Sequence, residues 1–204
     1  MIRKFYPSSL YNFLRFIQNN PVRENKKILD CGAGGGDPKL AFFHENGFET
    51  YGIDISDDQI NDAQNFSEKN SINLRIVKGD MKNIPFSSNF FVYVFSYLSM
   101  VHLSKKDIAI AINEIHRVLM KGGLCYLNFL SKDDVHFDEK RESNQGEIIS
   151  FHENQEEVHS YYEDEEPDDY FKNFEIIYKE KRQILNGKYF NTGRKCILDY
   201  ILKK

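Results

Sequence analysis

Residues 28–37, with the sequence ILDCGAGGGD, combine the residue types that surround a small bound ligand. An apolar run ends in Asp30, and it reads as a buried strand that leads directly into a glycine-rich turn. In an open parallel sheet, ligands bind at the carboxyl ends of the strands, and glycines let a ligand approach the main chain closely. We therefore expect the floor of a binding crevice at Gly32, Ala33, Gly34, Gly35 and Gly36.

A second acid, Asp54, follows Gly34 by twenty residues and ends the next predicted strand, 48–54. A carboxylate at that place accepts hydrogen bonds from both hydroxyls of a ribose and repels a 2′-phosphate. Asp54 could instead be an acid at a helix N-terminus, but Ser56 already fills that role. Glycines and Asp54 together indicate an adenosine-containing ligand without saying which one.

Asp37 argues against a phosphate at the glycine turn. A dinucleotide fingerprint requires glycine at position 37. The N-terminus of the following helix should attract the pyrophosphate, and a carboxylate at position 37 would repel it there. A phosphate-binding loop requires Gly-Lys-Ser/Thr, whereas this turn offers only Lys39, after Pro38. The expected ligand therefore carries adenosine but no phosphate at this turn.

The elements that must position these residues alternate along the chain. Apolar residues at helical spacing, or capping residues, predict helices over 8–19, 38–47 and 56–70. A further helix begins at Ser104 and is closed by Lys121-Gly122-Gly123. Apolar runs predict strands over 27–31, 48–54, 72–80, 90–98 and 124–130. This rhythm is typical of a parallel sheet with helices on both faces. Asn186-Gly187, between two strand-like runs, predicts a C-terminal antiparallel hairpin.

The length and composition of the chain limit the classes of protein to which it can belong. The 204 residues suffice for one α/β domain, and the longest apolar runs, such as residues 90–95, are far too short to cross a bilayer. Arg3 and Lys4 precede no continuous apolar segment, so we expect no signal peptide. The three cysteines lack metal-ligand spacing, which favours reduced thiols, no metal and a cytoplasmic location.

The charge distribution is uneven. Residues 142–171 contain eleven Asp or Glu and no Lys or Arg, so the rest of the chain is net positive. The segment could be a solvated acidic surface of loops and helices. Alternatively, it could be a flap that repels polyanions and tolerates a neutral or cationic substrate. Either interpretation makes nucleic acid a less expected partner.

Several motifs, taken in order, resemble the class I S-adenosylmethionine-dependent methyltransferases, particularly the small methyltransferase type 11 and tellurite-resistance-like groups. Residues 28–36 resemble the glycine motif of that family, and GIDIS at 52–56 resembles its ribose-binding strand end. GDMKNIPF at 79–86 resembles its adenine motif, and RVLMKGG at 117–123 resembles the turn before its fifth strand. The resemblance is close over 25–130.

This resemblance implies S-adenosylmethionine as cofactor and S-adenosylhomocysteine as product. The cofactor agrees with the turn, because it carries adenosine and cationic ammonium and sulfonium groups but no phosphate there. The implied fold is a Rossmann-like, seven-stranded, mostly parallel sheet of order 3-2-1-4-5-7-6, with helices on both faces and a C-terminal antiparallel hairpin. The implied cofactor-binding residues are Asp30, Gly32, Ala33, Gly34, Asp54, Ile55, Asp80, Met81 and Ser96. Asp80 would bond the adenine amino group, and Met81 would pack on its ring.

We expect residues 1–204 to form a single methyltransferase domain. Residues 1–24 would be an N-terminal helical cover, in which Tyr6 and Tyr11 either fold over the cofactor or simply pack. Residues 131–172 would be an acidic insert that forms a lid on the acceptor side.

The resemblance names no general base, so candidates come from positions expected to face the crevice. They are Tyr97, His102, His159, Tyr161 and Tyr162, and ordinary packing is the alternative role for each. The fourth strand is followed by SYLS rather than by Asn/Asp-Pro-Pro-aromatic, which disfavours adenine, cytosine and glutamine as acceptors. A small-molecule acceptor is therefore expected.

Three functions compete at this point. The main hypothesis is transfer of a methyl group from S-adenosylmethionine to a small molecule. An alternative is a catalytically silent module that binds the same cofactor and acts through a protein partner. A nicotinamide-dependent oxidoreductase is disfavoured by Asp37.

Overall fold

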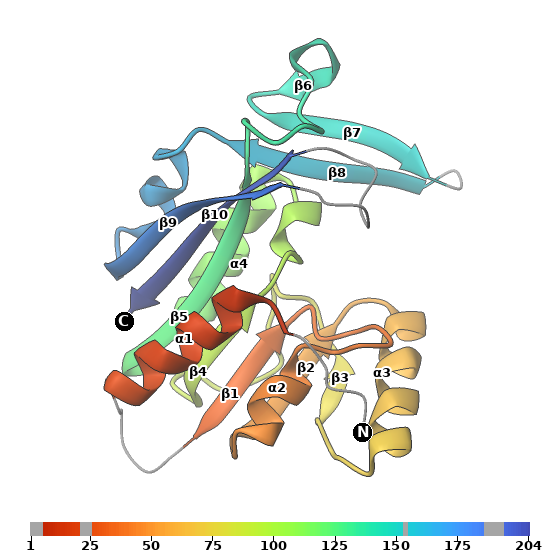
Figure 1. Cartoon of the computed structure of the whole chain (residues 1–204), viewed down its shortest axis with the longest axis vertical. Helices are drawn as coiled ribbons and strands as arrows, with labels where there is room; N and C mark the ends of the chain where they lie inside the picture. Colours follow the sequence, from red (N-terminus) through yellow and green to blue (C-terminus); the bar gives the residue numbers. More distant parts are fainter. Residues whose placement is uncertain (1–5, 21–25, 153–154, 186–193) are drawn as a thin grey trace.

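A computed structural model describes residues 6–20, 26–152, 155–185 and 194–204 (Figure 1). The strands are β1 (Lys27–Cys31), β2 (Glu49–Asp54), β3 (Ile76–Lys78), β4 (Phe91–Ser96), β5 (Leu119–Ser131), β6 (Glu142–Asn144), β7 (Glu147–His152), β8 (Gln155–Tyr162), β9 (Glu175–Leu185) and β10 (Arg194–Lys203). The α-helices are α1 (Ser8–Asn19), α2 (Leu40–Glu45), α3 (Asp57–Asn70) and α4 (Lys105–Val118). Short 3-10 helices are η1 (Met100–His102), η2 (Glu139–Arg141) and η3 (Glu166–Phe171).

The central sheet has the predicted order. Strands β3, β2, β1, β4 and β5 are parallel neighbours, β10 pairs with β5 in the antiparallel sense, and β9 pairs with β10. Asp30 of β1 lies opposite Gly52 of β2 and Phe95 of β4. The strand order therefore reverses between β1 and β4, directly above the glycine turn, where a parallel sheet opens a crevice.

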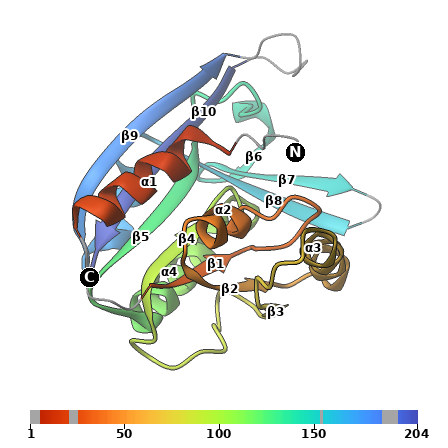
Figure 2. The same cartoon turned by 60° about the horizontal axis from the view of Figure 1, so that its bottom comes forward.

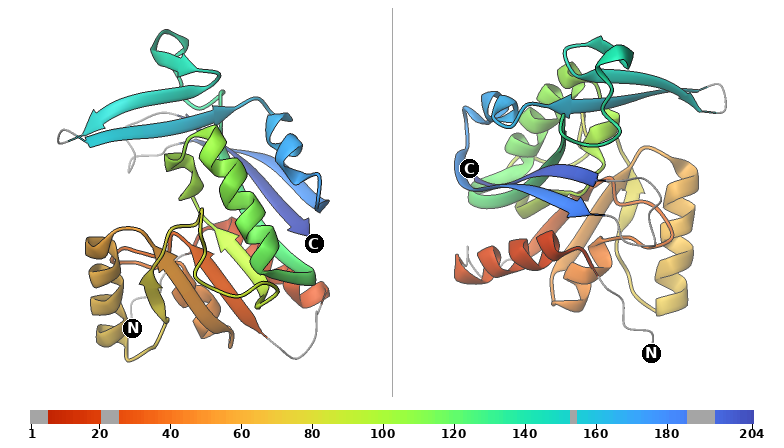
Figure 3. Two further views of the ribbon diagram at one scale, coloured as in Figure 1. Left: turned by 180° about the vertical axis from the view of Figure 1, so that it is seen from behind. Right: turned by 45° about the horizontal axis from the view of Figure 1, so that its top comes forward.

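Helices cover both faces of this sheet. On one face, α1 and α2 bury Leu10, Phe13 and Phe43 in an apolar cluster with the strands. On the opposite face, α4 buries one stripe of isoleucines, among them Ile108 and Ile112, and Figure 3 shows this helix from behind. In the part of the chain that the structure describes, no helix is long and apolar enough to span a bilayer.

Two element boundaries differ from the predicted ones. Lys121-Gly122-Gly123 lie inside β5 rather than after the helix, because β5 starts at Leu119 and crosses a register shift against β4. Gly122 adopts φ +79° there, and its N–H donates to Lys204 O at 2.7 Å. Helix α2 begins at Leu40 rather than at Pro38, and Asp37 does not cap it but pairs with Lys39.

The third strand is also shorter than predicted, because only Ile76–Lys78 pair with β2. The predicted hairpin is present as the pair β9–β10. Its turn at Asn186-Gly187 lies outside the described residues.

The insert after β5 is built mainly from strands, not from the loops and helices considered above. Strands β7 and β8 form an antiparallel hairpin, β6 pairs with β7, and β8 joins β5 through Leu130↔Tyr161. Ile148 and Tyr161 are each only 4 % exposed, so the hairpin buries an apolar side despite its acidic composition. Figures 1 and 2 show the hairpin lying across the carboxyl ends of the parallel strands.

Candidate cofactor and acceptor site

A cavity of about 570 Å³ opens at the carboxyl ends of β1 and β2. Six of the predicted cofactor-binding residues line it, namely Gly32, Gly34, Asp54, Ile55, Asp80 and Met81. It is large enough and polar enough on one side to hold a nucleoside-sized ligand.

The glycine turn forms the floor of this cavity and is coupled to Asp54. The N–H groups of Gly32 and Ala33 both donate to Ile53 O at 2.9 Å, and Gly34 N–H donates to Asp54 Oδ2 at 2.9 Å. A Cβ at Gly34 would lie 2.6 Å from that same oxygen, so only glycine allows the approach. Gly32 adopts φ +95°, a conformation that also favours glycine.

Asp54 keeps acceptor capacity for a ligand. Its Oδ1 accepts from Ser56 N–H at 3.0 Å, and its Oδ2 accepts from Gly34 N–H. A carboxylate offers about four lone-pair sites, so two remain for ribose hydroxyls. Ser56 caps α3 as predicted, since its Oγ accepts from Gln59 N–H at 3.3 Å.

The adenine side of the cavity carries exposed apolar surface. Ile55 is 67 % exposed although it is a large apolar residue beside the cavity, and Met81 is half-buried next to it on the lining. Asp80 Oδ1 accepts from Lys82 N–H at 2.8 Å, while Lys82 Nζ lies 3.9 Å from Oδ2, outside hydrogen-bonding distance. A planar apolar ring with an amino group would cover Ile55 and could donate to Oδ2, which Lys82 Nζ approaches only at 3.9 Å.

Three predicted cofactor residues lie behind the cavity wall rather than on it. Asp30 is 2 % exposed and Ala33 and Ser96 are each 1 % exposed. Ser96 Oγ donates to Cys31 O at 2.9 Å and so ties β4 to β1, while Ser99, three residues later, takes the place on the lining that was predicted for Ser96.

Asp30 nevertheless acts electrostatically on the site. Burial and the nearby carboxylate of Asp54 raise the pKa of Asp30 well above its ordinary value, against an opposing effect of Lys39. A buried carboxyl of this kind becomes easier to ionise when a cation binds beside it.

Sequence reasoning missed several lining residues. Gln59 carried a signal, because it stands at the capping-box position after Ser56. Ser99 and Leu98 follow β4 without any distinguishing motif, and Glu157 comes from the insert, more than a hundred residues from the glycine turn. Only tertiary folding places Glu157 at this cavity.

Leu98 is held in a strained conformation by a buried polar network. Its φ is +54°, which is uncommon for a bulky residue, and its N–H donates to Asn128 Oδ1 at 2.8 Å. Asn128 Nδ2 donates to the Tyr126 hydroxyl at 3.1 Å, and that hydroxyl donates to Asp199. Asp199 in turn pairs with Arg182 at 2.8 Å. The C-terminal hairpin thereby fixes a residue of the cavity wall.

Two of the predicted acceptor-side residues meet. The rings of His102 and His159 lie 4.8 Å apart, centroid to centroid, in an edge-on arrangement. Burial lowers the pKa of both histidines, Lys195 lowers them further, and Glu157 opposes the shift. His102 lines the cofactor cavity, and His159 lines a second cavity on its other side.

The three predicted tyrosines do not line the cofactor cavity. Tyr97 is half-buried, and burial raises its pKa. Tyr161 lines the second cavity, and burial raises its pKa to about 12. Tyr162 is fully buried, with Lys105 Nζ 4.3 Å from its ring centroid. Packing is therefore the observed role of Tyr162.

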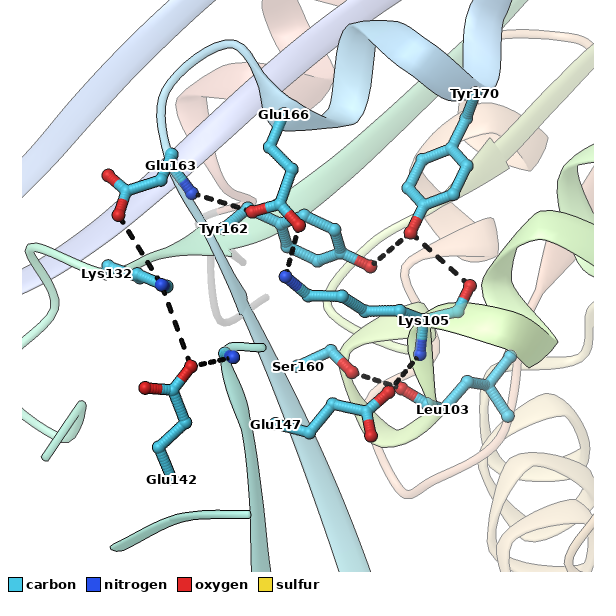
Figure 4. Close-up of polar contacts among 11 residues, drawn as sticks. Leu103, Lys105, Lys132, Glu142, Glu147, Ser160, Tyr162, Glu163, Glu166 and Tyr170 are labelled. Carbon is cyan, nitrogen blue, oxygen red and sulfur yellow. Dashed lines mark hydrogen bonds and ion pairs between the residues drawn. The ribbon is translucent and has the colours of Figure 1, made fainter. Parts of the chain in front are cut away.

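The insert is anchored on the segment that follows η1 (Figure 4). Glu147 of β7 accepts from Lys105 N–H at 2.6 Å, and Ser160 Oγ of β8 donates to Leu103 O at 2.7 Å. The Lys105 side chain is only 13 % exposed and forms an ion pair with Glu166. Since η1 carries His102, these contacts set the position of the insert relative to the cofactor cavity.

Helix α1 does not fold over the cavity. The rings of Tyr6 and Tyr11 contact Phe42 of α2, with centroid distances of 5.0 and 4.7 Å. None of the described residues of the N-terminal segment 1–24 lines the cofactor cavity. Of the two roles considered for these tyrosines, the structure shows packing.

Comparisons with known proteins agree with this site. Residues 28–123 match the family model described as a methyltransferase domain. Sterol 24-C-methyltransferase of Pneumocystis carinii is 33 % identical over 105 residues, which are 50 % of this chain and 27 % of that protein. Demethylmenaquinone methyltransferase of Staphylococcus carnosus is 30 % identical over 113 residues, 54 % of this chain and 46 % of that protein. The chain thus matches less than half the length of each.

A solved structure matches over nearly the whole chain. The S-adenosylmethionine-dependent methyltransferase of Methanosarcina mazei superposes with a TM-score of 0.77 at 19 % identity, covering 99 % of both chains. At that identity the likeness shows the fold, including the sheet order and the C-terminal hairpin. The methyltransferase-domain match covers the glycine turn, Asp54 and Asp80, and both findings are consistent with a class I S-adenosylmethionine-dependent methyltransferase.

Proposed function

We propose that the protein transfers a methyl group from S-adenosylmethionine to a small-molecule acceptor bound between the glycine turn and the insert. The observation that carries this proposal is the wall of the cofactor cavity, where His102 and Glu157 face the glycine turn from η1 and β8. Elements distant in sequence therefore enclose the side on which an acceptor must approach. The curated relatives act on sterols and on demethylmenaquinone by their names, which supports a small acceptor.

Each lining residue has a defined task in this proposal. Asp54 would accept the ribose hydroxyls, and Ile55 and Met81 would cover the adenine ring. Asp30, buried behind the lining, would ionise more readily when the cofactor's cationic end binds near it. When bound, the cofactor supplies a methyl group on a positively charged sulfur, which is already an activated leaving group. The protein then contributes mainly by positioning, which can be worth about 7–11 kcal/mol in favourable cases.

His102 and His159 are the proposed proton acceptors. Because burial lowers their pKa, both are neutral at neutral pH and each has a nitrogen lone pair available. A base is needed only for an acceptor that is protonated at the working pH, and it typically adds about 10²–10⁴-fold in rate.

The chain is proposed to act as one methyltransferase domain, with residues 131–172 as the lid on the acceptor side. Contacts of Glu147 and Ser160 with the segment before α4 support this role. Cys31, Cys125 and Cys196 are buried free thiols, which supports the proposal that the protein works in a reducing cytoplasm.

Calorimetric titration with S-adenosylhomocysteine, with NADH as the comparison ligand, tests the cofactor assignment. We expect micromolar binding of S-adenosylhomocysteine alone. Asp54→Ala should weaken that binding by about 1.5–3 kcal/mol, or roughly 10- to 150-fold, because it removes charge-assisted hydrogen bonds. Asp62→Ala, at an exposed position on α3, is the matched control and should bind normally.

Equal affinity in wild type and Asp54→Ala would remove Asp54 from the site. The catalytically silent alternative predicts cofactor binding without methyl transfer to any acceptor. A screen that follows formation of S-adenosylhomocysteine separates the two, since a single productive acceptor excludes the silent module.

A further inference from the structure

A second cavity, with a volume of about 330 Å³, adjoins the histidine pair on the side of the insert. His159 lines it, while the neighbouring ring of His102 lines the cofactor cavity. The two cavities are therefore neighbours at this pair, which contributes one ring to each. The other residues that line the second cavity are Leu130, Asp134, His136, Arg141, Ile148, Ser150, Tyr161 and Lys195.

One part of this cavity is apolar. Leu130 is 5 % exposed and Ile148 and Tyr161 are each 4 % exposed, and they form a buried cluster together with Val101. An apolar wall beside polar groups is typical of sites for small molecules. The wall suits a ring or a short hydrocarbon body.

The cavity also carries two cations. Lys195 from β10 and Arg141 from η2 line it. Among the described residues, neither forms an ion pair. Lys195 lies close enough to His102 and His159 for its charge to act on both. Two cations that converge on one cavity favour an anionic ligand.

Among the described residues that line this cavity, Asp134 is the one acid, and it already has hydrogen-bond partners. Asp134 is 4 % exposed, and its Oδ1 accepts from the main-chain N–H of His136 at 3.0 Å and contacts His136 Nδ1 at 2.8 Å. Its Oδ2 accepts from Cys196 N–H at 2.8 Å. Asp134 therefore orients His136 and leaves its Nε2 for another partner, and its single charge offsets only one of the two cations.

Five other acids of the insert form ion pairs away from the second cavity. Figure 4 shows Glu142 and Glu163 on either side of Lys132, with Nζ–O distances of 3.7 and 3.4 Å, and Glu166 with Lys105. Further along, Asp164 pairs with Lys181 at 2.6 Å, and Asp168 pairs with Lys179 at 3.0 Å. These five acids are paired within the insert, through Lys132, or with other elements, through Lys105, Lys179 and Lys181, and none of them lines the second cavity.

From these contacts we infer that the second cavity binds an anionic group of the methyl acceptor, a carboxylate or a phosphate on a small apolar body. Lys195 and Arg141 hold the anion, and the wall formed by Leu130, Ile148 and Tyr161 holds the body. The acceptor then extends past His159 toward the glycine turn. This inference rests on the proposed methyl transfer, and it opposes the idea that the acidic segment selects a neutral or cationic substrate.

The test uses three probes of one size: benzoate, phenyl phosphate and uncharged benzamide. Each is titrated by ligand-observed NMR against the full chain saturated with S-adenosylhomocysteine. We expect at least one anion to bind about tenfold more tightly than benzamide. The preferred anion distinguishes a carboxylate site from a phosphate site.

Substitutions locate the binding. Lys195→Gln should weaken the preferred anion about tenfold, and Arg141→Gln should weaken it to a smaller extent because Arg141 is more exposed. Lys69→Gln, an exposed lysine of α3, is the matched control and should change nothing. Circular dichroism and the affinity for S-adenosylhomocysteine, both expected to be unchanged, show that the variants are folded.

Three results would overturn the inference: benzamide binding as well as the anions, anion binding that survives Lys195→Gln, or no binding of any probe. The proposed function fails differently, through lack of S-adenosylhomocysteine binding in the wild type. In that case the probes are titrated against the free chain, because the lining of the second cavity contains no residue of the glycine turn.

Discussion

At the scale of single residues, the histidine pair is the feature with the clearest chemical consequence. His102 and His159 are far apart in the chain, yet their rings are in contact. Burial and the nearby cation Lys195 favour their neutral forms, and for His159 the neighbouring His102 and His136 act in the same direction, while Glu157 favours the charged form of both. The sum is a pKa below the ordinary value of 6.5 for each ring.

This lowering predicts the pH dependence of methyl transfer. In the proposed methyl transfer a neutral histidine is the base, so kcat/KM should fall toward low pH as the rings take up protons, with its midpoint below pH 6.5. His159→Gln should lose this acidic limb, whereas His44→Gln, a histidine at the end of α2, should keep it. An acidic limb that is unchanged in His159→Gln would exclude His159 as the base.

The same groups affect stability. Because the folded pKa lies below the unfolded one, the unfolded chain binds more protons, so the free energy of unfolding falls as the pH drops through and below 6.5. Chemical denaturation at pH 7.5 and at pH 5.5 measures this loss. The difference in the free energy of unfolding between the two pH values should be smaller in His159→Gln than in the wild type.

At the scale of elements, the C-terminal hairpin controls the end of β4. The chain of hydrogen bonds from Arg182 and Asp199 through Tyr126 and Asn128 reaches Leu98, whose φ of +54° places it on the cavity wall. Strained residues persist where the surrounding structure over-determines them. The hairpin is thus part of the cofactor site, although it contributes no lining residue among those described.

Asn128→Ala should therefore affect stability and binding together. The change leaves Leu98 N–H without its partner and removes a donor from the Tyr126 hydroxyl, and each buried unsatisfied group costs about 1–3 kcal/mol. Chemical denaturation should show that loss, and calorimetry should show weaker binding of S-adenosylhomocysteine. Asn61→Ala, exposed on α3, is the control; wild-type affinity in Asn128→Ala would show that Leu98 does not depend on the hairpin.

At the scale of the whole molecule, the insert and the parallel sheet enclose the site between them. The insert joins the body through the end of β5, through contacts of Glu147 and Ser160 with the start of α4, and through ion pairs such as Glu166–Lys105. These contacts lie next to η1. Loosening the insert should therefore change the structure of the acceptor side of the site and leave the structure of the ribose side unchanged.

Glu147→Ala tests this division. Removing the acceptor of Lys105 N–H should speed amide hydrogen exchange in residues 147–162, while exchange in β1 and β4 stays as in the wild type. The affinity for S-adenosylhomocysteine should change by less than about threefold, since one hydrogen bond away from the ligand is lost. Glu68→Ala on α3 is the control. Unchanged exchange in 147–162 would mean that other contacts suffice to dock the insert.

The local sequence determined the parallel half of the fold and the cofactor side of the site. Strand β1, the glycine turn and Asp54 are close in sequence, and the period of apolar residues and the Ser56 cap place them without long-range information. For that reason the sheet order was predicted correctly, and six of the predicted cofactor-binding residues line one cavity. The sequence predicted Ser96 at the cavity, whereas its hydroxyl points to the neighbouring strand. The way a strand ends decides whether its last residue points to a neighbouring strand or into the crevice.

Only the tertiary structure decided the acceptor side. The composition of residues 142–171 indicates an acidic surface, but the direction of several carboxylates depends on lysines contributed by distant elements, among them Lys105 and Lys181. Once these ion pairs form, Lys195 and Arg141 remain as the cations of the second cavity. Charge in a sequence is a sum, whereas the field at a site depends on which charges lie near it and which are already paired.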